Sequence, residues 1–232
     1  MTEIRYVEGH YALWDGLIAG HPGLVVDNCA SGGRRLDLET CLRSVPLWQS
    51  DTACGPGRAD WDQAQMCGLN LYLPIHLSCA WSPEPYVVRS SAASGAIVQF
   101  AYLDAGFPHA LAKASLAEAR ENRKYWYGDF YPLTAHTTAP DQFAAWQLHR
   151  ADLDAGLVLA FRRQDCAFFG LDTRLGGLAP DATYAVEFID EARARTEKTM
   201  TGREMAAAFP LSIPQRKASL VVRYRRAGAP GK

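Results

Sequence analysis

The chain has 232 residues, of which 48% are hydrophobic and 21% charged, and its formal net charge is −1. A charge so close to zero, without a basic stripe, argues against nucleic acid as a partner. No apolar run approaches the roughly 20 residues that a membrane-spanning helix needs, and the N-terminus lacks the basic and apolar regions of a signal peptide. We therefore expect a cytoplasmic protein without membrane association.

The first half of the chain alternates between helical and strand-like patterns. Apolar residues recur at helical spacing in residues 7–19, 34–42, 60–68, 87–93 and 108–128. Strand-like apolar runs occupy residues 24–29, 45–51, 70–78 and 96–103. This alternation with short links is typical of a parallel α/β sheet, and in a β/α barrel the active site lies where the links follow the strands. Four such units amount to half of an eight-stranded barrel.

The pattern changes after residue 131, where short apolar or alternating runs are separated by turn-forming residues. The runs cover residues 144–150, 156–163, 166–172, 183–190 and 218–226. They predict an antiparallel β domain, most simply a small sandwich. We accordingly divide the chain into a partial catalytic barrel at residues 1–129 and an all-β domain at residues 130–232.

The cysteines give no indication of a metal site. The six of them stand at positions 29, 41, 54, 67, 79 and 166. No two form a CxxC pair, and no Cys/His group has zinc-finger spacing. We expect reduced, mostly buried thiols and no bound metal.

Two short motifs follow two of the expected strands. DNCASGGR occupies residues 27–34 and WQSD residues 48–51, with Cys29 and Asp51 22 positions apart. The sequence resembles the bacterial α-galactosidases of glycoside hydrolase family 36, where an (E/D)NC-x-(S/G)-GG-R turn follows barrel strand five and a W-x-S-D element ends strand six. The resemblance continues through LNLYLPIHLS and the β domain. It implies the C-terminal half of a TIM (β/α)8 barrel, strands five to eight, followed by a small antiparallel β-sandwich.

The resemblance also implies roles for individual residues. Asp51 would be the general acid/base that donates a proton to the leaving group, and Cys29, Ser31 and Gly32 would lie against the sugar. A retaining glycosidase needs two carboxyl groups about 5–5.5 Å apart, and its acid holds a proton best when partly desolvated. Trp48, inside an apolar strand, would supply such surroundings. A glycine lets backbone N–H groups approach the sugar closely.

Other interpretations of these residues stay open. Asp51 could be an ordinary loop or capping carboxylate, and the turn after Cys29 an ordinary strand-to-helix connection around a buried cysteine. Trp48 belongs to the core as often as to a sugar-stacking platform. His76 is expected to be a hydrogen-bonded core histidine. Asp27 and Asn28 could bind either neighbouring loops or substrate.

Two departures from the family pattern stand out. Thr52, Ala53 and Cys54 follow Asp51, where the family often has a second aspartate. The family's nucleophile, an aspartate in a K-x-D-x-N element that ends strand four, has no counterpart before Arg5. The expectation is therefore a C-terminal fragment of a retaining α-galactosidase that lacks its nucleophile and is inactive alone.

The implied substrate is an oligosaccharide with a terminal α-galactoside, hydrolysed without a cofactor. The implied protein partner is the missing N-terminal half of the barrel, and the oligomeric state, a homo-oligomer included, stays open. Three alternatives remain: a relative that transfers galactose, a non-catalytic carbohydrate-binding module, and a degenerate remnant.

Overall fold

The computed structural model describes residues 1–29, 32, 34–45, 48–73, 75–91 and 95–228. Its largest layer is a six-stranded sheet in the order β3-β4-β5-β10-β7-β8, with antiparallel pairing throughout. The strands are β3 (Asp129–Pro132), β4 (Phe143–Arg150), β5 (Ala155–Arg162), β7 (Thr183–Ile189), β8 (Arg195–Thr201) and β10 (Ala218–Arg226). The predicted combination of helices with an antiparallel β part is confirmed.

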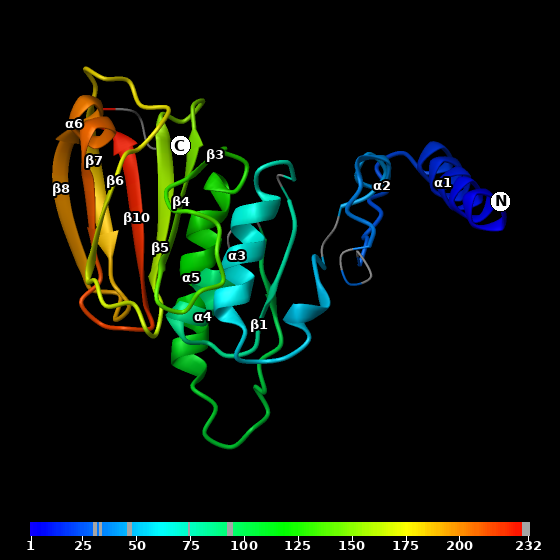
Figure 1. Ribbon diagram of the computed structural model, residues 1–232, viewed down its shortest axis with the longest axis horizontal. Helices are drawn as coiled ribbons and strands as arrows, with labels where there is room; N and C mark the ends of the chain where they lie inside the picture. The colour runs from blue at the N-terminus through cyan, green and yellow to red at the C-terminus, as the bar shows by residue number, and fades with distance from the viewer. Residues whose placement is uncertain (30–31, 33, 46–47, 74, 92–94, 229–232) are drawn as a thin grey trace.

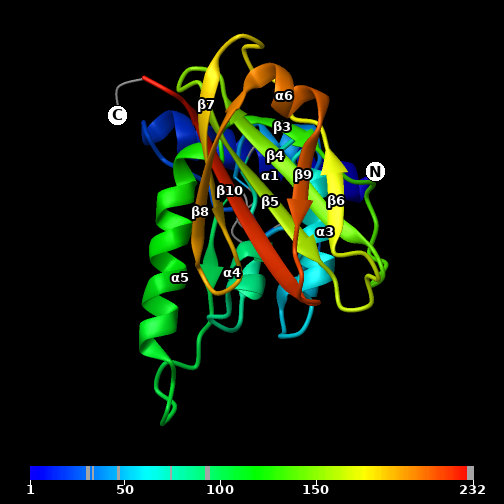
Figure 2. The ribbon, with the colours of Figure 1, turned by 90° about the vertical axis from the view of Figure 1, so that its left-hand side faces the viewer.

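Both faces of this sheet are covered, which explains why its central strands β4 and β5 are buried along almost their whole length. On one face lie α3 (Ala59–Leu69), α4 (Pro85–Ser91) and α5 (His109–Asn122) (Figure 1). The other face packs against a two-stranded sheet of β6 (Gly170–Thr173) and β9 (Phe209–Ser212), with α6 (Gly202–Ala207) beside it (Figure 2). β5 is therefore buried at every position, as a strand covered on two sides should be.

Buried arginines join the helices to the sheet. Arg163, fully buried, donates from Nε to Gln63 Oε1 of α3 at 3.0 Å and from Nη1 to the Thr137 and Ala139 carbonyl oxygens at 2.8 and 2.9 Å. Arg89 of α4 pairs with Glu118 of α5, Nε to Oε1, at 2.7 Å and donates from Nη1 to Ser219 Oγ of β10 at 3.1 Å. Because a buried charge without a partner is costly, these contacts fix the helices against the strands.

The predicted helices are found, with shifted ends. Residues 7–19 fall within α1 (Thr2–Gly20), and residues 108–128 contain α5 and the 3-10 helix η2 (Arg123–Tyr125). The expected helix at residues 34–42 shortens to α2 (Leu38–Cys41), because the Asp37 carboxylate caps it by accepting from Thr40 N at 3.0 Å. α4 begins at Pro85, and the expected residues 92–93 lie outside the described residues.

The four expected parallel strands are much shorter than predicted. Residues 24–29 form only a parallel bridge from Asp27 to Val45, and the run at residues 96–103 reduces to β2 (Ile97–Val98), parallel to β1 (Cys79–Ala80). The prediction of a strand from residue 70 is wrong, because the helical turn continues there, with Leu73 N donating to Leu69 O at 2.8 Å. Backbone contacts nevertheless join each of these segments to the next, including Gln49 N to Leu77 O at 3.1 Å.

The N-terminal helix α1 stands away from the sheet (Figure 1). None of its residues is buried, and Ile4, Tyr6 and Leu13 are each more than half exposed. It is held against α2 by polar contacts, among them an exposed ion pair in which Arg43 Nε lies 2.8 Å from Asp15 Oδ1. Contacts of this kind contribute little stability.

Candidate active site

The turn that follows Asp27 is fixed by the side chain of Asn28. Asn28 is buried, its Nδ2 donates to the carbonyl oxygen of Arg35 at 2.7 Å, and its Oδ1 accepts from Arg35 Nε at 3.2 Å. Its backbone N–H donates to Val45 O at 2.9 Å. The side chain of Asn28 therefore bonds within its own loop, and its contact with substrate stays a prediction. These bonds close the loop between residues 28 and 35.

The structure brings Gly32 and Asp51 together. Gly32 has a φ of +72°, and a Cβ placed on it would lie 3.0 Å from Asp51 Oδ2. A positive φ and so close a neighbour both favour glycine over any residue with a side chain. The Asp51 carboxylate thus packs directly against the backbone of Gly32, which places the two motifs side by side.

The backbone that carries Asp51 is held by short-range hydrogen bonds. Asp51 opens the 3-10 helix η1 (Asp51–Ala53), and the Ser50 side chain caps it by accepting from Thr52 N at 3.2 Å. Thr52 Oγ1 donates to Gln65 Oε1 of α3 at 3.0 Å, and Gln49 Nε2 donates to the same oxygen at 3.1 Å. Gln65 therefore fixes the residues on both sides of the Ser50–Asp51 pair.

His76 extends this network through Gln49. It is a fully buried core histidine, as expected. Its Nδ1 lies 2.5 Å from Gln49 Oε1 and its Nε2 lies 3.0 Å from Asn70 Oδ1. Burial lowers the pKa of His76 to about 4, so the ring is neutral near pH 7 and its single N–H donates to one of these two oxygens. Gln49 and Gln65 escaped the sequence analysis because a glutamine inside an apolar pattern carries no signal of its partner.

The remaining predicted residues are more open than expected. Asp51 is exposed, so the expected desolvation by an apolar strand is wrong: residue 51 begins a 3-10 turn and does not end a buried strand. Cys29 is exposed too, against the expectation of a buried thiol, whereas Trp48 is half-buried. Ser31 lies outside the described residues.

Within the described part of the chain, no group of three His, Cys, Asp or Glu side chains is placed to hold a metal ion. In the same residues no helix combines the length and the apolar character that crossing a bilayer requires.

No protein-family model matches the sequence. A search of curated proteins found "Alpha-galactosidase 1" of Pediococcus pentosaceus, 27% identical over 195 residues, which cover 78% of this chain and 26% of that protein. Among solved structures, AgaA of Geobacillus stearothermophilus, a family 36 α-galactosidase in complex with stachyose, matches with a TM-score of 0.77 at 21% identity over 96% of this chain. AgaB of the same organism matches with a TM-score of 0.73 at 20% identity and 96% coverage.

The predicted resemblance to family 36 α-galactosidases is confirmed. The chain has the fold of part of these α-galactosidases and spans about a third of their length, 32% of AgaA and 31% of AgaB. AgaA has also been solved with raffinose, and that structure matches with a TM-score of 0.76 at 20% identity over 96% of this chain and 32% of that one.

Proposed function

We propose that the chain supplies the acid/base side of a retaining α-galactosidase active site, with Asp51 as the proton donor. One observation carries the proposal: the Asp51 carboxylate lies against the backbone of Gly32, so closely that a Cβ on Gly32 would stand 3.0 Å from Oδ2, and the two motifs therefore share one place in the structure. A sugar seated on this turn would place its glycosidic oxygen within reach of the acid. In the proposed site Cys29, Ser31 and Gly32 contact the sugar and Trp48 flanks it.

The proposed chemistry needs a second carboxylate. In retaining hydrolysis one carboxylate attacks the anomeric carbon while the acid protonates the departing oxygen, and the acid then deprotonates the water that completes the reaction. The K-x-D-x-N element that holds the family's nucleophile does not occur among the 232 residues. The proposed reaction therefore draws its nucleophile from another polypeptide or from residues outside this sequence.

The proposed architecture is the second half of a β/α barrel at residues 1–129, followed by a β-sandwich at residues 130–232. Its support is the order of backbone contacts: Asp27 to Val45, Gln49 to Leu77, and Cys79 to Ile97. Each segment contacts the next in sequence, as neighbouring barrel strands do. The apolar residues exposed on α1 would be covered by the other half of such a barrel.

The proposed substrates are oligosaccharides with a terminal α-galactose, such as the raffinose and stachyose in the AgaA structures. A direct test replaces the nucleophile with azide. Azide attacks the anomeric carbon of p-nitrophenyl α-galactoside, the bond to the phenolic oxygen breaks, and p-nitrophenolate leaves with the electron pair. We expect the chain to accelerate this reaction and to form the inverted product, β-galactosyl azide.

The result that contradicts the proposed sugar site is azide-dependent release no faster than with a chain carrying Gly32→Val, which fills the turn; the role of Asp51 as acid is tested with raffinose, whose leaving group needs the proton. Formation of α-galactosyl azide would contradict the missing nucleophile, because retention requires two displacements. A p-nitrophenyl β-galactoside control separates the α-specific reaction from general catalysis.

A further inference from the structure

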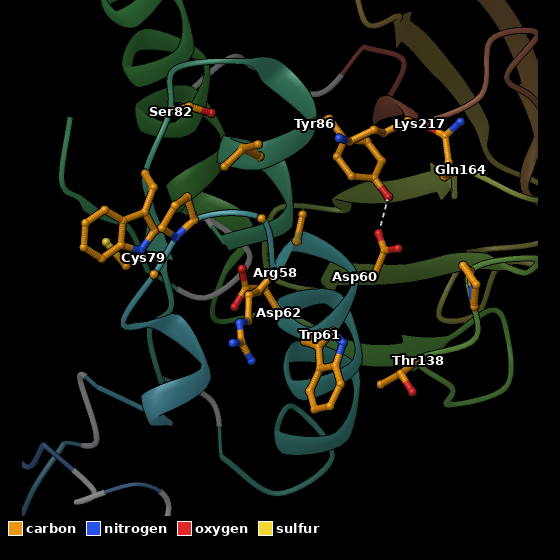
Figure 3. Close-up of a pocket in the computed structure, with 17 residues that line it drawn as sticks. Arg58, Asp60, Trp61, Asp62, Cys79, Ser82, Tyr86, Thr138, Gln164 and Lys217 are labelled. Atoms are coloured by element: carbon orange, nitrogen blue, oxygen red, sulfur yellow. Dashed lines mark hydrogen bonds between the residues drawn. The ribbon is translucent and has the colours of Figure 1, made fainter. Parts of the chain in front are cut away.

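A pocket of about 380 Å³ lies between residues 55–62 at the start of α3, residues 79–82 in and after β1, and the loops that join the β strands (Figure 3). Its volume falls in the range of about 300–1,000 Å³ that is usual for small-molecule sites. Thr138, Gln164 and Lys217 reach it from the β side, and Gly55 belongs to its wall only four residues after Asp51. The pocket therefore joins the proposed acid/base region to the β part of the molecule.

Two tryptophans supply flat apolar surface to this pocket. Trp61 lines it and keeps 49% of its surface exposed, so the indole is available to a ligand. Trp81 also lines it, and its orientation is fixed because Nε1 donates to Ala53 O at 2.8 Å. Indole rings of this kind provide contact area with little conformational freedom to lose.

The polar side chains of the pocket are also held in place. Tyr86 donates its hydroxyl to Asp60 Oδ1 at 2.5 Å, and Ser78 donates its hydroxyl to Asp62 Oδ1 at 2.6 Å (Figure 3 draws the first). Asp62 is only 5% exposed. A pocket whose acceptors and rings are fixed before binding loses less conformational entropy when a ligand arrives.

We propose that this pocket is a second saccharide-binding site, which takes one neutral hexose unit of an oligosaccharide. A hexose has an apolar face of C–H groups and a rim of hydroxyls that both donate and accept hydrogen bonds. The tryptophans match the face, and the carboxylates of Asp60 and Asp62 with the amide of Gln164 match the rim. The proposal does not depend on catalysis at Asp51.

The charges of the pocket favour a neutral ligand over an ion. The negative charges of Asp60 and Asp62 are balanced by the positive charges of Arg58 and Lys217, which also line the pocket. Burial, together with the charge of Asp60, raises the pKa of Asp62 to about 7 although the Ser78 hydroxyl opposes the shift. A carboxyl group that shares its proton near neutral pH can donate to a sugar hydroxyl as well as accept from one.

The test is calorimetric titration of the whole chain with raffinose, compared with Trp61→Ala and Gln164→Ala. Both side chains are exposed, so neither change disturbs the core. We expect Trp61→Ala to weaken binding roughly tenfold, and Gln164→Ala to weaken it less. Tyr102→Ala, which removes another exposed ring, is the matched control and should leave the affinity unchanged.

The result that overturns the proposal is raffinose binding that Trp61→Ala leaves within twofold, or no raffinose binding by the unaltered chain. Displacement of raffinose by equimolar inorganic phosphate would overturn it as well, because the pocket would then be an anion site. Failure of the acid/base proposal would give a different result: the azide reaction of p-nitrophenyl α-galactoside would be absent while Trp61→Ala still weakened raffinose binding. Trp61→Ala should leave that azide reaction unchanged.

Discussion

Replacing Asp62 by asparagine should change how the stability of the protein depends on pH. The Asp62 side chain is 5% exposed and accepts a hydrogen bond from Ser78. Burial is the main reason that its pKa rises from the ordinary 3.8 to about 7, and the nearby charge of Asp60 adds to the rise. Asparagine keeps the shape and the acceptor oxygen but cannot ionise.

The size of the effect follows from proton linkage. Between pH 4 and pH 7 the folded protein holds a proton on Asp62 that the unfolded chain has released, so folding becomes less favourable as the pH rises. A shift of about three pKa units corresponds to about 4 kcal/mol of free energy of unfolding. This stability is present below pH 4, is lost progressively up to about pH 7, and changes no further above it. The Asp62→Asn protein lacks this loss.

The assay is urea unfolding of both proteins at half-unit steps from pH 4 to pH 8, analysed by linear extrapolation. The variant should gain stability over the unaltered protein by about 4 kcal/mol across this range. The control is Asp104→Asn, at an exposed loop position. Its free energy of unfolding should change with pH in the same way as that of the unaltered protein. The reasoning would be refuted if the free energies of unfolding of Asp62→Asn and the unaltered protein changed with pH in the same way. That result would mean that Asp62 has the same pKa in the folded and unfolded states.

Two further predictions concern packing and the turn. Arg163→Met should lower the free energy of unfolding by about 3–5 kcal/mol, measured by urea unfolding, because it leaves buried acceptors without a donor. Arg203→Met breaks the ion pair with Asp181, in which the Arg203 side chain is 71% exposed and that of Asp181 88%. It should lower the free energy of unfolding by less than about 1 kcal/mol. Gly32→Ala should reduce azide-dependent cleavage of raffinose at least tenfold by crowding Asp51, whereas Gly23→Ala, at a φ of +90° with open space around it, should not.

Secondary structure was predicted best where a whole segment is buried and its sequence is therefore apolar throughout. The run at residues 156–163 is apolar throughout, and β5 (Ala155–Arg162) is buried at every position. β8 (Arg195–Thr201) was missed because it is an edge strand whose RTEKTMT sequence is exposed over most of its length. An edge strand can be charged on both faces, so it shows no apolar alternation.

The site was only partly predictable for a similar reason. The resemblance of the two motifs to family 36 was what associated the turn at Gly32 with Asp51, and both follow short segments of one α/β pattern. The exposure of Asp51 depends on which other segments pack around it in the folded protein, and the hydrophobic pattern of nearby residues does not indicate this. Likewise, the bond from Arg163 to Gln63 joins residues 100 positions apart, and only the packing of α3 on the sheet brings them together.

The most direct test of Asp51 as the acid compares two leaving groups in the azide reaction. Proton donation matters for the disaccharide released from raffinose, whose departing oxygen is an alkoxide unless it is protonated, and hardly at all for p-nitrophenolate, which leaves readily without a proton. Asp51→Asn should therefore slow azide-dependent cleavage of raffinose by about 10²–10⁴-fold while slowing that of p-nitrophenyl α-galactoside far less, with Asp104→Asn slowing neither. Equal losses on both substrates would contradict the account.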